Sequence, residues 1–277
     1  MFKLLSLFSA FFISASLVCS GELETADNDA PKPTPSADVV TPPAKENFHI
    51  YLLMGQSNMA GRGSLEKRQT KNLRVLALAA DGQWVVAKDP MHSKQGRTEP
   101  GVGPGIPFAI EMLKTDPKIT IGLVPCAVGG SPLKRWVKNG DLYKIAIERA
   151  KAVEPYGIIK GVLWHQGETD ASKQAFAESY EARLTRMFSD LRQDLGQPDL
   201  PIVVGQLGEF VSQHPKSPFT EPVRAALANI PKTVPHVGFA DSAGLKDKGD
   251  KLHFNTDAQK EFGKRYAHAM YEIQKQK

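Results

Sequence analysis

The chain has 277 residues, of which 41% are hydrophobic and 23% are charged, and its formal net charge is +5. This composition is ordinary for a soluble globular protein, and the length suits one large α/β domain or two small ones. Basic residues are scattered among acidic ones, and they form no basic and aromatic cluster. Nucleic acid is therefore not an expected partner.

The first twenty residues differ from the rest of the chain. A positive start at Met1-Phe2-Lys3 precedes an apolar run too short to span a bilayer, and a cleavage site is expected near Ser20. This layout predicts a cleaved signal peptide (1–20), export to the periplasm or the cell exterior, and no integral membrane segment in the mature chain. A lipoprotein anchor at Cys19 is the alternative, which the preceding Val18 disfavours.

Residues 21–47 are acidic and then rich in proline, so they cannot bury enough apolar surface to fold. We expect a disordered linker there, followed by one folded domain over residues 48–277. If Cys19 leaves with the signal peptide, Cys126 is the one remaining cysteine, and an internal disulfide is excluded.

In residues 48–277, short apolar segments alternate with segments of helical spacing. The expected core strands are 49–54, 119–124, 158–164, 202–207 and 237–240, and the expected helices are 106–113, 142–153, 174–195, 223–230 and one from Thr256 with a capping box. Residues 73–78 and 84–86, around Asp81-Gly82, predict an accessory hairpin. The alternation predicts a three-layer α/β/α sandwich with a mostly parallel five-stranded sheet.

Ser57 lies in a small polar turn directly after the first expected strand. Chemistry in open α/β sheets takes place just past the carboxyl ends of the strands, which makes Ser57 the candidate nucleophile. Met59 occupies the place of the second glycine of a Gly-x-Ser-x-Gly elbow. An α/β-hydrolase places several strands before its nucleophile, whereas a single expected strand precedes Ser57, so this chain does not fit that fold.

A serine nucleophile needs a base and an acid that orients the base. His253 precedes the last helix, and Asp250 stands three residues earlier, within reach of its second ring nitrogen. Among the other histidines, His165 also lies in a cluster at a strand end, together with Glu168.

Donors for an oxyanion also follow the strands. The N–H of Ser57, the backbone at Gly130 and the amide of Gln166 are candidates for this role. No cluster has the spacing of metal ligands, so we expect neither a metal nor another cofactor.

Four motifs follow one another along the chain: Gly55-Gln56-Ser57-Asn58-Met59, Gly129-Gly130-Ser131 with Trp136, Trp164-His165-Gln166-Gly167-Glu168-Thr169-Asp170, and Asp250-x-x-His253. In this order they resemble the sialate O-acetylesterase (SASA) branch of the SGNH hydrolases, which have a flavodoxin-like fold. That branch includes the acetylxylan esterases of carbohydrate esterase family 6. The resemblance covers about Phe48 to Tyr271, and it implies metal-free removal of acetyl groups from carbohydrate.

Carried over to these positions, the resemblance makes Ser57 the nucleophile and His253 the base, with Ser57, Gly130 and Gln166 as the oxyanion hole. Asp250 ranks first as the acid, and Glu168 ranks second because some relatives use the corresponding glutamate. Four residues within or after the first two motifs are expected to line the sugar site. They are Asn58, Arg62, Arg135 and Trp136.

The expected function is therefore that of an exported serine esterase acting on acetylated carbohydrate. Acetylated xylan, sialic acid and other acetylated glycans all remain open as substrates, as does the oligomeric state. Two alternatives also remain: a lipid or thioester hydrolase on the same scaffold, and a carbohydrate-binding protein with an inactive site.

Overall fold

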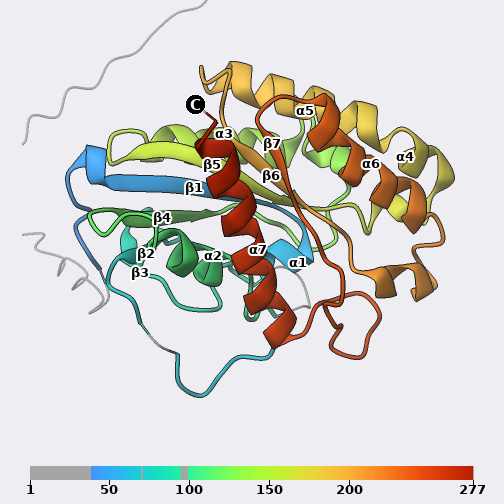
Figure 1. Cartoon of the computed structure of the whole chain (residues 1–277), viewed down its shortest axis with the longest axis horizontal. Helices are drawn as coiled ribbons and strands as arrows, with labels where there is room; N and C mark the ends of the chain where they lie inside the picture. Colours follow the sequence, from blue (N-terminus) through green and yellow to red (C-terminus); the bar gives the residue numbers. More distant parts are fainter. Residues whose placement is uncertain (1–38, 70, 95–98, 277) are drawn as a thin grey trace, which may run out of the picture. The chain divides into compact units, whose positions relative to one another are not determined.

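A seven-stranded sheet lies between two layers of helices in the computed structural model, which describes residues 39–276 except 70 and 95–98 (Figure 1). The strand order is β3-β2-β4-β1-β5-β6-β7, and neighbours are parallel except β2 and β3. The strands are β1 (Phe48–Gly55), β2 (Val75–Leu78), β3 (Trp84–Val86), β4 (Thr120–Pro125), β5 (Ile158–His165), β6 (Ile202–Gly205) and β7 (Val237–Ala240). The three-layer sandwich is confirmed.

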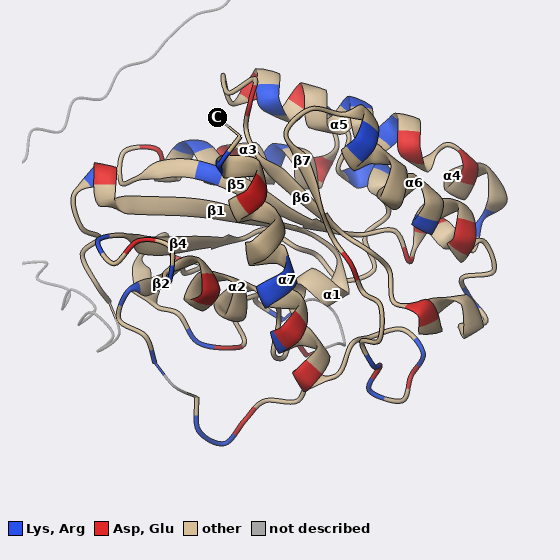
Figure 2. Ribbon diagram, in the orientation of Figure 1, with Lys and Arg blue, Asp and Glu red and all other residues tan. Residues whose placement is uncertain are grey.

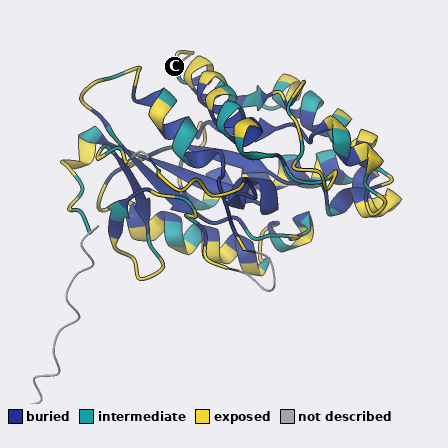
Figure 3. Ribbon diagram, turned by 90° about the horizontal axis from the view of Figure 1, so that it is seen from below, coloured by how far each residue is buried: buried dark blue, intermediate teal, exposed yellow. Residues whose placement is uncertain are grey.

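Both faces of the sheet are covered, which explains the uninterrupted apolar run of β1. The strands are buried, and the exposed residues lie on the outer sides of the helices (Figure 3). Ile50 and Leu52 belong to a cluster that includes side chains of α3, α5 and α6, whereas Tyr51 and Leu53 pack with α2 and α7. These helices are α2 (Gly105–Met112), α3 (Asp141–Val153), α5 (Tyr180–Asp194), α6 (Thr220–Thr233) and α7 (Thr256–Gln274). Short 3-10 turns lie at Lys45–Asn47, Leu133–Arg135, Asp170–Ser172 and Glu209–Gln213.

The sheet has seven strands and not five because the expected hairpin is part of it. β2 pairs with β4 in parallel, and β3 then forms the edge. The structure also extends the ordered region towards the N-terminus. The N–H of Val40 donates to the Trp84 carbonyl at 2.8 Å, so part of the expected linker covers the β3 edge.

One expected helix is divided in two, and the last helix begins at Thr256 as expected but has a different cap. The segment 174–195 is divided into α4 (Gln174–Glu178) and α5, because the Ser179 hydroxyl donates to the Ala175 carbonyl at 2.6 Å and competes with the regular helix. The N-cap of α7 is Asn255, whose side chain accepts from the Ala258 N–H. The Thr256 hydroxyl donates to Ser64 instead.

Three neighbouring strands deliver their polar motifs to one edge of the sheet. β1 is the centre, and it leads through Gly55 into the short helix α1 (Ser57–Ala60). Gly55 has φ +127°, and a Cβ there would lie 2.0 Å from the His165 carbonyl oxygen of β5. Only glycine allows this approach, which places the Ser57 turn directly beside the end of β5.

Lysine and arginine alternate with aspartate and glutamate over the outer helices, as expected for a solvated surface (Figure 2). Among the described residues, no helix has the length and apolarity needed to cross a bilayer. The predicted signal peptide and residues 21–38 of the predicted linker lie outside the described part of the chain.

Candidate active site

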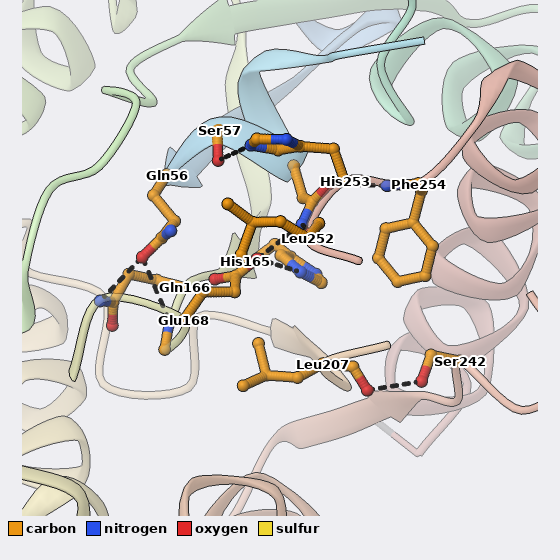
Figure 4. Close-up of polar contacts among 12 residues, drawn as sticks. Gln56, Ser57, His165, Gln166, Glu168, Leu207, Ser242, Leu252, His253 and Phe254 are labelled. Carbon is orange, nitrogen blue, oxygen red and sulfur yellow. Dashed lines mark hydrogen bonds and ion pairs between the residues drawn. The ribbon is translucent and has the colours of Figure 1, made fainter. Parts of the chain in front are cut away.

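Ser57 and His253, 196 positions apart in the sequence, meet at the carboxyl edge of the sheet. The Ser57 hydroxyl oxygen lies 3.0 Å from His253 Nε2 (Figure 4). Ser57 is the first residue of α1 and is 4% exposed, and His253 lies two residues before the cap of α7. The two predicted partners are therefore within direct proton-transfer distance.

Asp250 is hydrogen-bonded to the second ring nitrogen of His253. Its Oδ2 lies 2.7 Å from His253 Nδ1, and its Oδ1 accepts the N–H groups of Leu252 and His253. Glu168, the second candidate for the acid, makes no hydrogen bond with His253. The geometry of an orienting acid therefore belongs to Asp250.

The local environment lowers the pKa of both members of this pair. Burial raises the pKa of Asp250, but the hydrogen bonds from His253 and from two backbone N–H groups outweigh it. Burial lowers the pKa of His253 below its ordinary value of 6.5, and the Asp250 carboxylate opposes this effect only in part. At neutral pH His253 is therefore uncharged and able to accept a proton.

Asn58 is bonded to both neighbours of His253 in the chain. Its amide nitrogen donates to the Leu252 carbonyl at 3.1 Å, and its side-chain oxygen accepts the Phe254 N–H at 3.1 Å. The same nitrogen donates to Glu168 Oε1 at 2.6 Å. These bonds make Asn58 a clamp between the Ser57 turn and the His253 loop, and its side chain does not line the pocket.

Glu168 anchors this clamp from the end of β5. It is 3% exposed, and its Oε1 also lies 3.4 Å from His165 Nε2. Burial raises the pKa of Glu168, yet its contacts with His165 and Asn58 outweigh that effect and hold the pKa below its ordinary value. A charged acceptor makes the hydrogen bond from Asn58 stronger than a neutral one.

Two of the three expected oxyanion donors are available. In the described part of the chain, the backbone N–H groups of Ser57 and Gly130 have no hydrogen-bond acceptor, and both residues line the pocket. Gly130 has φ +67°, and nothing lies within 4 Å of the place a Cβ would take.

The third expected donor, Gln166, has an amide that is already bonded to other protein groups. Its side-chain nitrogen has two hydrogens and three buried acceptors: Asp170 at 2.7 Å, and the Ser131 carbonyl and Gln56 Oε1 at 3.2 Å. Its oxygen accepts the Tyr180 hydroxyl. Gln166 is 0% exposed and does not line the pocket, because Asp170 and Tyr180 hold its amide behind the pocket wall.

Of the other three residues expected to line the sugar site, one lines the pocket and two do not. Arg62 lines the pocket, where it is 8% exposed. Arg135 instead pairs with Asp141 at the surface, with its Nε 3.0 Å from Oδ1. Trp136 is fully buried, donates to the Ser131 hydroxyl and packs edge-on against Trp164. Neither Arg135 nor Trp136 lines the pocket, because the first is held in a surface ion pair and the second is packed in the core.

The pocket in front of Ser57 has a volume of about 400 Å³. Sequence reasoning missed several lining residues from the loop after β6, among them His214, Lys216 and Ser217, and also missed Gln56. Gln56 could have been found because it precedes the nucleophile. The loop residues carry no motif, and only the fold brings them to the pocket.

Two other groups bear on the chemistry. Within the described ranges, no group of three or more His, Cys, Asp or Glu side chains could hold a metal ion. Cys126 is a buried free thiol, and burial raises its pKa to about 12, so it is a poor nucleophile.

Serine hydrolases use an alcohol, an imidazole and a carboxylate that are joined in this order by hydrogen bonds. Ser57, His253 and Asp250 form such a line at the edge of the sheet. Comparison with known families agrees with this class. The chain belongs to the SASA family, described as carbohydrate esterase, sialic acid-specific acetylesterase, whose model matches residues 47–272. It is a carbohydrate esterase and hence a carboxylic ester hydrolase, as the motifs indicated.

Individual relatives support this assignment. The chain is 35% identical over 243 residues to the probable carbohydrate esterase At4g34215 of Arabidopsis thaliana, covering 79% of this chain and 89% of the relative. The crystal structure of that Arabidopsis protein matches with a TM-score of 0.74 at 33% identity, covering 82% and 98% of the two chains. The structure of NanS shares the fold, with a TM-score of 0.69 at 18% identity over 85% and 100%.

The clamp yields a stability prediction. Asn58→Ala leaves the buried Glu168 carboxylate and the Phe254 N–H without their amide partner, so we expect the free energy of unfolding to fall by about 2–4 kcal/mol. Asn229→Ala is the matched control, because Asn229 donates to Glu181 at 2.7 Å near the surface, and its loss should be below about 1 kcal/mol. Urea unfolding measures both, and equal losses would contradict the clamp.

Proposed function

We propose that the protein is an exported serine esterase that removes O-acetyl groups from carbohydrate through an acetyl-serine intermediate. The observation that carries the proposal is the line of hydrogen bonds from Ser57 to His253 to Asp250, which opens onto the pocket. Export is supported by the signal-like composition of residues 1–20.

In the first half of the reaction, Ser57 Oγ attacks the acetyl carbonyl while its proton passes to His253 Nε2. The Asp250 carboxylate holds the ring by Nδ1 and stabilises the imidazolium that forms. The N–H groups of Ser57 and Gly130 donate to the oxyanion of the tetrahedral intermediate. That intermediate collapses when the sugar oxygen leaves and takes the proton from His253.

In the second half, water repeats the attack on the acetyl-serine. His253 takes a proton from the water, the ester bond to Ser57 breaks, and Ser57 recovers its proton as acetate leaves. The small volume and the polar lining of Thr169, Ser172 and Lys216 favour a short acyl group on a polar carrier over a long lipid chain.

The charges of the pocket favour an acidic sugar. Arg62 and Lys216 both line it, and neither forms an ion pair within the described part of the chain. The acid on the same wall, Glu168, is bonded to Asn58. An acetylated sugar that carries a carboxylate, such as an O-acetylated sialic acid, would supply the missing negative charge.

The proposal is tested by measuring acetate release from acetylated sugars with wild-type protein and Ser57→Ala. We expect wild-type turnover and a variant reduced to the residual rate that binding and the oxyanion donors provide, on the order of 10³-fold or more below wild type. A folded Ser57→Ala protein that keeps wild-type activity would rule out the serine mechanism.

Asp250→Asn should change both the height and the position of the pH profile. The carboxylate raises the pKa of His253 against the effect of burial, so its removal lets the His253 pKa fall further. The acid limb of kcat/KM therefore moves to lower pH, while the plateau drops by about 10²–10⁴-fold because the ring loses its orientation. A larger loss in Glu168→Gln than in Asp250→Asn would make Glu168 the acid instead.

Lys216→Gln tests the preference for an acidic sugar. We expect kcat/KM for an O-acetylated sialic acid to fall by about three- to tenfold, and that for a neutral acetylated xylo-oligosaccharide to stay unchanged. Lys144→Gln, at an exposed position of α3, is the control for overall charge. Equal effects on both sugars would exclude a charge contact at Lys216.

A further inference from the structure

The side-chain amide of Gln56 has one orientation that its surroundings permit. Its oxygen accepts the backbone N–H groups of Gly167 at 3.5 Å and Thr169 at 3.4 Å, and the Gln166 amide nitrogen at 3.2 Å. A backbone N–H can only donate, so the group that faces Gly167 and Thr169 must be the oxygen. The amide nitrogen is therefore turned the other way (Figure 4).

That nitrogen is a free donor at the pocket wall. Gln56 lines the pocket next to Ser57, although the whole residue is only 2% exposed. Within the described residues, this nitrogen has no hydrogen-bond acceptor. It is not fully enclosed by the protein. Its N–H groups thus reach the pocket surface, where a ligand can accept them.

We infer that Gln56 is the third oxyanion donor, joining the N–H groups of Ser57 and Gly130, and that Gln166 positions it from behind. Asp170 accepts from the Gln166 amide, whose nitrogen in turn donates to Gln56 Oε1. Arg183 fixes Asp170 from the far side at 2.9 Å. This buried chain of hydrogen bonds keeps the Gln56 nitrogen in place before substrate binds, which is what electrostatic stabilisation of an oxyanion requires.

The inference rests on the proposed esterase function, and two substitutions test it. Gln56→Glu keeps an oxygen for the three donors and replaces only the pocket-facing nitrogen. Gln56→Met removes the donor without adding charge. Gln206→Met is the matched control, because Gln206 is a 5% exposed glutamine after β6 that bonds Leu207 and Arg224 and does not line the pocket.

Kinetics are measured on p-nitrophenyl acetate and on an acetylated sugar. Both Gln56 variants should lose about 10²–10³-fold in kcat with little change in KM, and by the same factor on the two substrates, because both pass through the same oxyanion. Gln206→Met should stay within threefold of wild type. Combining Gln56→Met with Gln166→Met should cost little more than Gln56→Met alone, since Gln166 acts through Gln56.

A loss confined to the sugar substrate would make Gln56 a sugar-binding residue and overturn the inference. A loss below threefold on both substrates would overturn it as well, while leaving the esterase function in place. Wild-type protein that hydrolyses neither ester would instead overturn the proposed function, and the inference with it.

Discussion

The hydrogen bond between His253 and Ser57 depends on a loop being held in place by a side chain next to the nucleophile. Asn58 bonds the backbone on both sides of His253, and Glu168 anchors Asn58. Phe254 adds an apolar anchor, since it is fully buried and packs edge-on against Phe210 and Phe262. The imidazole therefore has little freedom to leave the alcohol, and the residue that secures it makes no contact with the pocket.

The residues in and behind the pocket fall into two sets, one fixed by the sheet and one on a loop at the pocket rim. Gln56, Gln166 and Asp170 form a buried network at the ends of the central strands β1 and β5, where position is set by the sheet. The rim residues His214 and Lys216 belong to a loop after β6. In the proposed mechanism, the groups that meet the transition state belong to the first set, and the groups proposed to select the sugar lie on the loop, where substitution disturbs the fold least.

Sequence alone predicted the layers and the five core strands, because apolar periodicity determines these. The meeting of Ser57 with His253 was predicted from the Asp250-x-x-His253 pair and the family resemblance. Sequence did not predict which way side chains point. Gln166 follows β5 as expected, but Asp170 and Tyr180 turn its amide away from the pocket. Trp136 lies close in sequence to Gly130, yet it packs in the core. Lys216 could not be placed, because no local pattern links that loop to the pocket.

Labelling with a fluorophosphonate at a series of pH values shows whether His253 activates Ser57. Peptide mass spectrometry should locate a single adduct on Ser57. Its rate should rise as His253 loses its proton, with a midpoint below the ordinary histidine pKa of 6.5, and labelling should collapse in His253→Ala. An adduct on another residue, or undiminished labelling of Ser57 in His253→Ala, would contradict the account.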